Sequence, residues 1–391
     1  MGYGFDRIID RHGTSCIKFD FAKQRGHTPD ELSYWVADMD FRTAPEIIRA
    51  LKKRADNGIF GYTDPDENYF NTVNRWLKKK YSYEAKYEWL SVTPGIVSAI
   101  AVAVQAYTEK GDAILINNPV YYPFAGTIKA AERKVVSCDL TWDGRTYQLN
   151  LDDFERKIVE EKPKLYLLCN PHNPGGKNWT KTELEYIGKI CLKHGVVVLS
   201  DEIHADFTWD GKVHTVFASI SKELEEITVT CTSPSKSFNI AGLQISNIFI
   251  ASSELRRKFK NALDVIGYSQ ANIFGLEACK AAYEKGERWL DRVSAYISGN
   301  LEKSVEFLNE RIPEIKVCKP EATYLLWLDC RGLGLTDAEL NRKIRHEAKV
   351  WLDAGNIFGK PGEGFVRINV ACSWKYLKKG LEAIVQVLSR N

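Results

Sequence analysis

Five short apolar segments rich in β-branched residues constrain the fold of this chain more than any other feature. They lie at residues 113–118, 164–170, 195–201, 227–232 and 247–252. Each is apolar at successive positions, which is typical of strands buried on both faces of a parallel sheet. Helix-like stretches such as 96–110 and 180–194 separate them, and Thr180 with Glu183 has the spacing of a helix capping box. We therefore expect an α/β fold with a mostly parallel central sheet.

The sequence changes character near residue 286, and its length of 391 residues suits two domains. A long amphipathic stretch (286–311) is followed by shorter strand candidates at 324–329 and 364–371 and by a closing helix from Trp374. This order of elements predicts a smaller α+β domain beside a large α/β domain. The expected boundaries are 47–285 for the large domain, and 1–46 together with 286–391 for the small one.

Charge and composition argue against several classes of partner. Lys and Arg number 54 against 51 Asp and Glu, a near-balance that argues against nucleic acid. No apolar run reaches the roughly 18–20 residues that span a bilayer, and the first residues lack a signal-peptide pattern. The nine cysteines form no C-x-x-C pair and several sit in apolar runs, which favours a reducing compartment. We expect a cytoplasmic protein.

Polar residues follow the predicted strands at the points where these strands end. Ligands of open α/β sheets bind beyond the carboxyl ends of the strands. The candidates are Asn173 after 164–170, Asp201 and His204 after 195–201, Ser233, Ser235 and Lys236 after 227–232, and Gly95 and Ile96 at the start of 96–110. Together they offer an amine, a carboxylate, an amide and a set of N–H groups suited to a phosphate.

This set of groups suits pyridoxal 5'-phosphate, which needs an amine, a carboxylate facing its ring nitrogen and a phosphate cradle. Lys236 supplies the amine, Asp201 faces the ring nitrogen, and Asn173 donates to the phenolic oxygen of the ring. The expected phosphate contacts are Gly95 and Ile96 at a helix N-terminus and the hydroxyls of Ser233 and Ser235.

Three motifs in order resemble the fold-type I pyridoxal-phosphate enzymes, the aspartate aminotransferase superfamily. They are N-P-H-N-P at 170–174, S-D-E-I-H at 200–204 and S-x-S-K-x-F-N-x-A-G-L at 233–243. Within that superfamily, W-V-A-D-M-D-F at 35–41 and Gly61-Tyr62-Thr63, with D-E-I-H, resemble the MalY/PatB group of cystathionine β-lyases. The resemblance runs from about residue 30 to the C-terminus.

The resemblance implies further roles for individual residues. Tyr121 stacks on the cofactor ring and counts with Lys236 and Asp201 as catalytic. Arg367 holds the α-carboxylate of the substrate, and Asn173 contributes to that site. The segment from Trp35 to Ala37 lines the substrate pocket. Tyr62 reaches the phosphate bound by the neighbouring subunit, so the resemblance implies a homodimer with shared active sites.

Two positions depart from the aminotransferase pattern. His204, expected at the cofactor, stands where many aminotransferases have a tyrosine, and Gln244 stands where they have a phosphate-binding arginine. A metal site built from Asp201, His204, Asp206 and His214 matches no ligand spacing that we can justify, and we expect none.

The leading functional prediction is a pyridoxal-phosphate-dependent lyase that cleaves L-cystathionine or a related S-substituted cysteine to a thiol, pyruvate and ammonia. An aminotransferase that uses the same residues is the alternative. A lyase-fold protein with an added regulatory binding role is a third hypothesis, although intact Lys236, Asp201, Asn173 and Arg367 argue against a purely non-catalytic protein.

Overall fold

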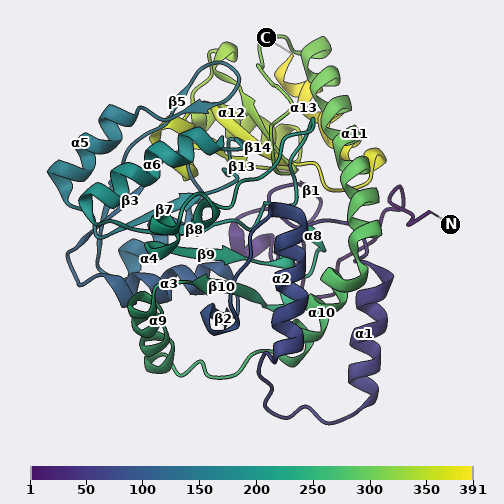
Figure 1. Cartoon of the computed structure of the whole chain (residues 1–391). Coiled ribbons are helices and arrows are strands. Elements are labelled where there is room, and N and C mark those ends of the chain that lie inside the picture. The colour runs from purple at the N-terminus through teal and green to yellow at the C-terminus, as the bar shows by residue number, and fades with distance from the viewer. Residues whose placement is uncertain (1, 390–391) are drawn as a thin grey trace.

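A seven-stranded β-sheet forms the centre of the computed structural model, which describes residues 2–389 (Figure 1). In spatial order its strands are β2 (Leu90–Thr93), β10 (Ser246–Ile250), β9 (Thr228–Thr232), β8 (Val197–Asp201), β7 (Leu165–Cys169), β3 (Ala113–Ile116) and β4 (Lys134–Ser137). The five strands from β9 to β4 are parallel, whereas β10 is antiparallel to both of its neighbours. The expected mostly parallel sheet is confirmed.

Helices cover both faces of this sheet because its strands carry apolar side chains on both faces. One face is covered by α3 (Ile96–Tyr107), α4 (Pro123–Ala130) and α9 (Ser253–Val265), and the other by α5 (Leu151–Glu161), α6 (Lys181–His194) and α7 (Lys222–Glu226). Along β3, Ile114 and Ile116 pack on the first face and Leu115 on the second. Each such side chain contributes roughly 1.5–3 kcal/mol when fully buried.

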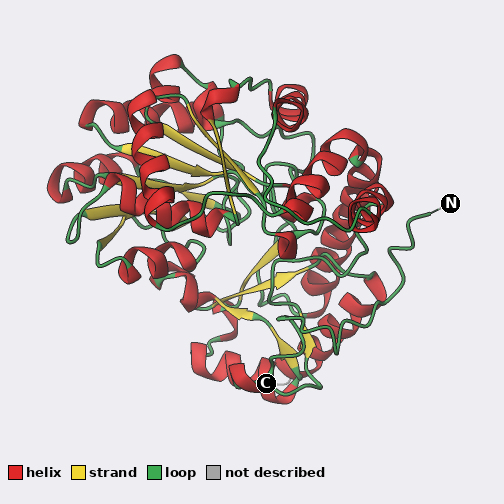
Figure 2. Ribbon diagram, turned by 90° about the horizontal axis from the view of Figure 1, so that it is seen from below, coloured by secondary structure: helices red, strands yellow, loops and turns green. Residues whose placement is uncertain are grey.

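A second, three-stranded antiparallel sheet lies apart from the central one (Figure 2). Its strands are β11 (Leu325–Asp329), β14 (Phe365–Asn369) and β13 (Asp353–Ala354). The α-helices of the C-terminal part of the chain are α11 (Glu287–Arg311), α12 (Asp337–Arg342) and α13 (Trp374–Leu388). The N-terminal segment joins this part, since β1 (Leu32–Ser33) pairs in parallel with β12 (Val350–Trp351). The domain boundaries given above stay a prediction.

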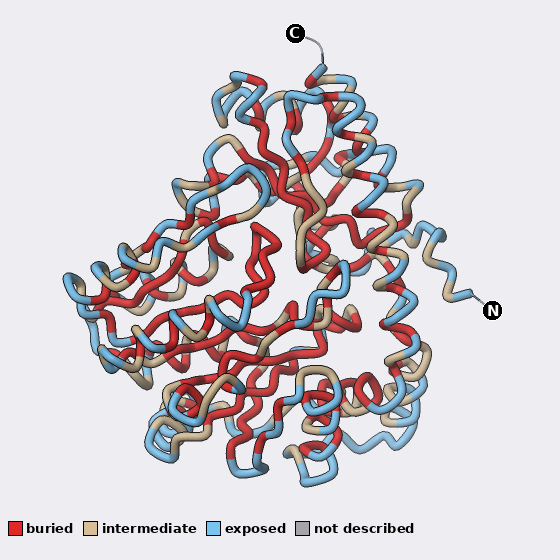
Figure 3. The backbone as a smooth tube through the Cα atoms, turned by 45° about the horizontal axis from the view of Figure 1, so that its top comes forward, coloured by how far each residue is buried: buried red, intermediate tan, exposed pale blue. Residues whose placement is uncertain are grey.

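Four further helices and a hairpin belong to the fold. They are the helices α1 (Pro45–Asp56), α2 (Glu67–Tyr81), α8 (Pro234–Ser237) and α10 (Ile273–Lys285), and the hairpin of β5 (Thr141–Trp142) and β6 (Tyr147–Gln148). Buried residues concentrate along the central strands, whereas exposed residues lie on the outer sides of the helices (Figure 3). Between residues 2 and 389, no helix has the length and apolar character needed to cross a membrane.

Local sequence explains where the elements that carry the site begin and end. Thr180 and Glu183 form the expected capping box at the start of α6. The strand candidates at 113–118, 164–170, 195–201 and 227–232 became β3, β7, β8 and β9 with shifts of one or two residues at their ends. Consequently the polar residues that follow these strands lie at one edge of the sheet.

Candidate active site

A cavity of about 320 Å³ lies at the carboxyl ends of the central strands. Lys236 of α8, Asp201 at the end of β8 and Asn173 in the loop after β7 all line it. Ala37 reaches the same cavity from the N-terminal segment. Residues from four separate stretches of the chain therefore meet around one space.

Lys236 lies on a short helix whose start is held by its own side chains. Ser233 is the N-cap of α8: its Oγ accepts from the amide of Ser235 at 3.1 Å and donates to the carbonyl of Ile245 at 2.7 Å. The Nζ of Lys236 donates to the carbonyl of Ala37 at 2.6 Å. Burial lowers the pKa of the Lys236 amine, and Arg367 lowers it further, whereas Asp38 and Asp201 raise it.

Asp201 is a buried carboxylate that lacks a cationic partner at hydrogen-bonding distance. It is 5% exposed, and the one hydrogen bond that its side chain makes among residues 2–389 comes from the amide of Ile203 at 3.2 Å. Burial raises the pKa of Asp201 to about 7. A cation placed in the cavity beside this carboxylate would keep it ionised.

Arg367, at the centre of β14, is held by three acceptors beside the cavity. Its Nη1 donates to Asn173 Oδ1 at 2.8 Å, and its Nη2 donates to the carbonyl of Trp35 at 2.9 Å and to the carboxylate of Asp353. Both members of the Arg367–Asp353 pair are buried. Three of the five N–H groups of Arg367 are thus engaged, and its Nε, one of the two that remain, is buried without a partner among the described residues.

The start of α3 forms another wall of the cavity. Gly95 precedes the helix with a φ of 148°, a conformation that favours glycine, and no described atom lies within 4 Å of the place where a Cβ would stand. The first N–H groups of a helix have no partner within it, and the helix dipole favours an anion there. Ile96 and Ser235 line the same cavity.

His204 and Tyr121 also line the cavity. Burial lowers the pKa of His204 to about 3, so its ring is neutral, and its Nδ1 has no hydrogen-bond partner among the described residues. Tyr121 is partly buried, and burial raises the pKa of its phenol well above the usual range. Neither group carries a charge near neutral pH.

Four predicted site residues do not line this cavity: Arg367 and Trp35, which connect to it through the hydrogen bond from Arg367 to Asn173, and Ser233 and Tyr62. The hydroxyl of Ser233 is turned to Ile245 and caps α8, so this residue orients the helix of Lys236 instead of facing the space. Tyr62 is 95% exposed and lies in a neighbouring surface hollow, whose lining shares Pro94 and Gln244 with the cavity.

The structure also identifies residues that sequence reasoning missed. Asp353 pairs with Arg367, and Tyr324 donates to the carbonyl of Ala37 at 3.0 Å beside Lys236. Asn369 donates through Nδ2 to the carbonyls of Val36 at 2.6 Å and Asp38 at 2.5 Å. Asn369 lies two residues after Arg367 on β14, so both side chains lie on the same face of the strand. This spacing is the feature of the sequence that could have identified Asn369 as a site residue.

The residues around the cavity fit pyridoxal phosphate, the cofactor expected from the sequence. The cavity holds a lysine amine, an unpaired buried carboxylate and an open helix N-terminus, which are the three groups that this cofactor requires. Asp201 suits the ring nitrogen because a protonated ring would supply its missing cation. Asp206 accepts a hydrogen bond from Ser237, and His214 Nε2 lies 2.8 Å from a carboxylate oxygen of Glu202.

Comparisons with known proteins extend over the whole chain. A family model described as "Aminotransferase class I and II" matches residues 35–384. Cystathionine beta-lyase PatB of Bacillus subtilis is 42% identical over 385 residues, which cover 98% of this chain and 100% of the relative. Protein MalY of Escherichia coli is 32% identical over 388 residues, covering 99% of each chain. The crystal structure of cystalysin from Treponema denticola, which contains pyridoxal 5'-phosphate, matches with a TM-score of 0.96 at 37% identity, covering 100% of this chain and 99% of that one.

Proposed function

The chain belongs to the aminotransferase class I and II family, and within this family we propose that it is a pyridoxal-phosphate-dependent carbon–sulfur β-lyase. The observation that carries the proposal is the cavity in which the Lys236 amine and the unpaired Asp201 carboxylate lie together, next to Arg367. The similarity to proteins named cystathionine beta-lyase and cystalysin supports a lyase rather than a transferase.

Each residue has a defined part in holding the cofactor. Lys236 would bond it, Asp201 would face its ring nitrogen, and Asn173 would donate to its phenolic oxygen. Tyr121 and His204 would contact the ring, and the start of α3 with Ser235 would hold the phosphate. When bound, pyridoxal phosphate supplies an electron sink for the negative charge that develops at the substrate α-carbon.

Arg367 orients the amino-acid substrate through its α-carboxylate. Its guanidinium is already fixed by Asn173, the Trp35 carbonyl and Asp353, so little conformational entropy is lost when substrate binds. The N–H groups of Arg367 that remain unengaged would then bind the substrate carboxylate. Trp35 and Ala37 form the adjoining wall of the substrate pocket.

Lys236 then acts as the general base. Once the substrate amine has replaced Lys236 on the cofactor, the freed Lys236 amine can accept the α-proton, and burial and Arg367, which both lower its pKa, favour the uncharged form that this step needs. The Ala37 carbonyl at 2.6 Å receives a hydrogen bond from the resulting ammonium group and holds it in place. Loss of the thiol from the β-carbon, followed by hydrolysis, gives pyruvate and ammonia.

We also propose that the active unit is a homodimer with shared sites. Ile59, Phe60 and Tyr62 are exposed by 71%, 57% and 95%, and Val265 and Ile266 by 87% and 55%. Phe60 and Tyr62 line the hollow that adjoins the cavity. Exposed apolar side chains gathered beside a site favour a protein partner, and a second copy would bring its own Tyr62 to the phosphate. Nine unpaired thiols support a reducing, cytoplasmic location.

A product assay tests the lyase function directly. Purified protein loaded with pyridoxal phosphate is incubated with L-cystathionine or S-methylcysteine without a keto acid, and pyruvate and free thiol are measured. Both products are expected in equal amounts. Negligible pyruvate together with rapid amino-group exchange between an amino acid and 2-oxoglutarate would refute the lyase and establish the aminotransferase.

A further inference from the structure

The guanidinium of Arg367 lies over the aromatic ring of Phe358, with its central carbon 4.8 Å from the ring centroid. Phe358 is the last residue of a short 3₁₀ helix, Gly355–Phe358, and is 1% exposed. Arg367 is also buried, so the contact is poorly solvated. A cation is attracted to the face of an aromatic ring, and most strongly where both groups are desolvated. The ring of Phe358 therefore attracts the charge that is expected to hold the substrate carboxylate.

The ring and the three acceptors of Arg367 restrain different movements of its guanidinium. Asn173, the Trp35 carbonyl and Asp353 accept from N–H groups, which lie in the plane of the guanidinium. The ring of Phe358 lies against a face of that plane. Hydrogen bonds fix the edges of the plane, whereas a ring against its face opposes tilting. Phe358 thus adds a restraint that the three acceptors supply only weakly.

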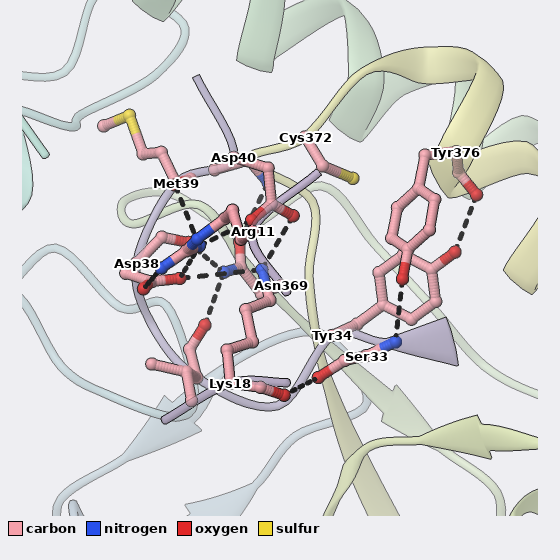
Figure 4. Close-up of polar contacts among 12 residues, drawn as sticks. Arg11, Lys18, Ser33, Tyr34, Asp38, Met39, Asp40, Asn369, Cys372 and Tyr376 are labelled. Atoms are coloured by element: carbon pink, nitrogen blue, oxygen red, sulfur yellow. Dashed lines mark hydrogen bonds and ion pairs between the residues drawn. The ribbon is translucent and has the colours of Figure 1, made fainter. Parts of the chain in front are cut away.

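The loop that carries Trp35 is itself anchored by ion pairs and hydrogen bonds (Figure 4). Arg11 lies 2.6 Å from Asp38 Oδ2 and 2.6 Å from Asp40 Oδ1. Asn369 donates to the carbonyl of Asp38 at 2.5 Å. Because these contacts restrain the loop, the Trp35 carbonyl is a fixed acceptor for Arg367.

Phe358 is held by elements of both sheets. The ring of Trp327, on β11, packs edge-on against it with ring centroids 5.6 Å apart and an interplanar angle of 87°. The Phe358 carbonyl accepts from the amide of Val120, in the segment after β3, at 2.9 Å. The next residue, Gly359, has a φ of 116°, and a Cβ there would lie 2.5 Å from Cγ of Asn118. The ring under Arg367 therefore has a fixed position.

We propose that Phe358 is a positioning residue for Arg367: the face of its ring holds the guanidinium so that the unengaged N–H groups stay directed at the α-carboxylate of the substrate. The inference rests on the proposed function, which assigns this carboxylate to Arg367. A restrained guanidinium loses little conformational freedom when an anion binds. Weakening the attraction of the ring therefore weakens binding of the carboxylate and leaves binding of the substrate amine unaffected.

The test places one, two or three fluorine atoms on the ring of Phe358 in the full-length protein loaded with pyridoxal phosphate. Each fluorine withdraws electron density from the ring face, with little change in ring size, and so weakens the attraction for a cation. Calorimetry measures the dissociation constants of two probes. The first is S-methyl-α-methylcysteine, and the second is its analogue in which a methyl group replaces the carboxylate. Neither probe has an α-proton, so neither is turned over.

The dissociation constant of the carboxylate probe is expected to rise with each fluorine, by about fivefold in all, whereas that of the carboxylate-free probe stays constant. Phe365 is the matched control, because it is also 1% exposed and lies 4.8 Å from a cation, Arg331, that does not line the cavity. The same fluorination of Phe365 is expected to change neither constant. Phe358→Leu, which has no ring face, is a second variant with the same selective loss expected.

A constant affinity for the carboxylate probe across the Phe358 series, or an equal loss of affinity for both probes, would overturn the proposal. If Arg367→Lys also bound the carboxylate probe as the wild type does, the failure would lie in the proposed carboxylate site itself. Pyruvate formation is not measured in this test, so the lyase function and the positioning role can fail separately.

Discussion

Replacing Asp201 by asparagine is expected to stabilise the cofactor-free protein while it disables catalysis. Burial raises the pKa of Asp201 from 3.8 to about 7, so the folded chain retains a proton that the unfolded chain has already released. For a raised acid pKa, stability is highest below the unfolded value and falls as the pH rises towards the folded one. Between about pH 4 and pH 7, each pH unit lowers the free energy of unfolding by about 1.4 kcal/mol, and the total loss above pH 7 is about 4 kcal/mol.

Asparagine removes this cost because it is neutral at every pH and can still accept from the Ile203 amide. Urea unfolding of cofactor-free wild type and Asp201→Asn, at equal protein concentration, is expected to show a gain of about 4 kcal/mol near pH 8 and less than half of that near pH 5. In the loaded enzyme, kcat is expected to fall by about 10²–10⁴, since an amide cannot keep the ring nitrogen protonated.

Asp143→Asn serves as the control, because the pKa of Asp143 is lowered whereas that of Asp201 is raised. Asp143 lies in the β5–β6 turn, where hydrogen bonds from the Thr146 amide and other donors lower its pKa, so its replacement is expected to bring no gain near pH 8. The reasoning about Asp201 would be refuted if Asp201→Asn were no more stable than the wild type near pH 8, or if its gain were equal at both pH values.

Three further outcomes are expected. Lys236→Ala should fold, fail to retain the cofactor after borohydride reduction, which in the wild type bleaches the yellow colour and fixes the cofactor on the lysine, and lose about 10³-fold or more in kcat. Near-normal turnover would exclude Lys236 as the base. Arg367→Lys should raise KM about 10–100-fold with a smaller effect on kcat, because one ammonium group cannot replace the planar guanidinium that binds Asn173, the Trp35 carbonyl and Asp353 together. Steady-state kinetics measures both constants, and an unchanged KM would contradict this expectation. Tyr62→Phe should weaken cofactor binding about tenfold without altering sedimentation as a dimer, and a fully active monomer would exclude the shared site.

The sequence by itself determined the central layer of the fold and the residues at its edge. Strands such as β3 are apolar at successive positions, so burial on both faces follows from composition alone, and parallel strands bring their carboxyl ends to one edge. For this reason Asn173, Asp201 and Lys236 could be predicted to meet although they are far apart in the chain. The capping box of α6 was equally local and equally predictable.

Only the tertiary structure decided which distant partners complete the site. The antiparallel direction of β10 leaves no trace in an apolar run, because both sheet types bury such a strand in the same way. Ser233 stands in the right motif, yet its hydroxyl donates to the carbonyl of Ile245, which the fold brings beside it. Asp353 meets Arg367 through β13 pairing, and Arg11 meets Asp38 through the folding of the N-terminal segment. Each of these contacts is set by packing between elements, which local propensity and motif spacing do not encode.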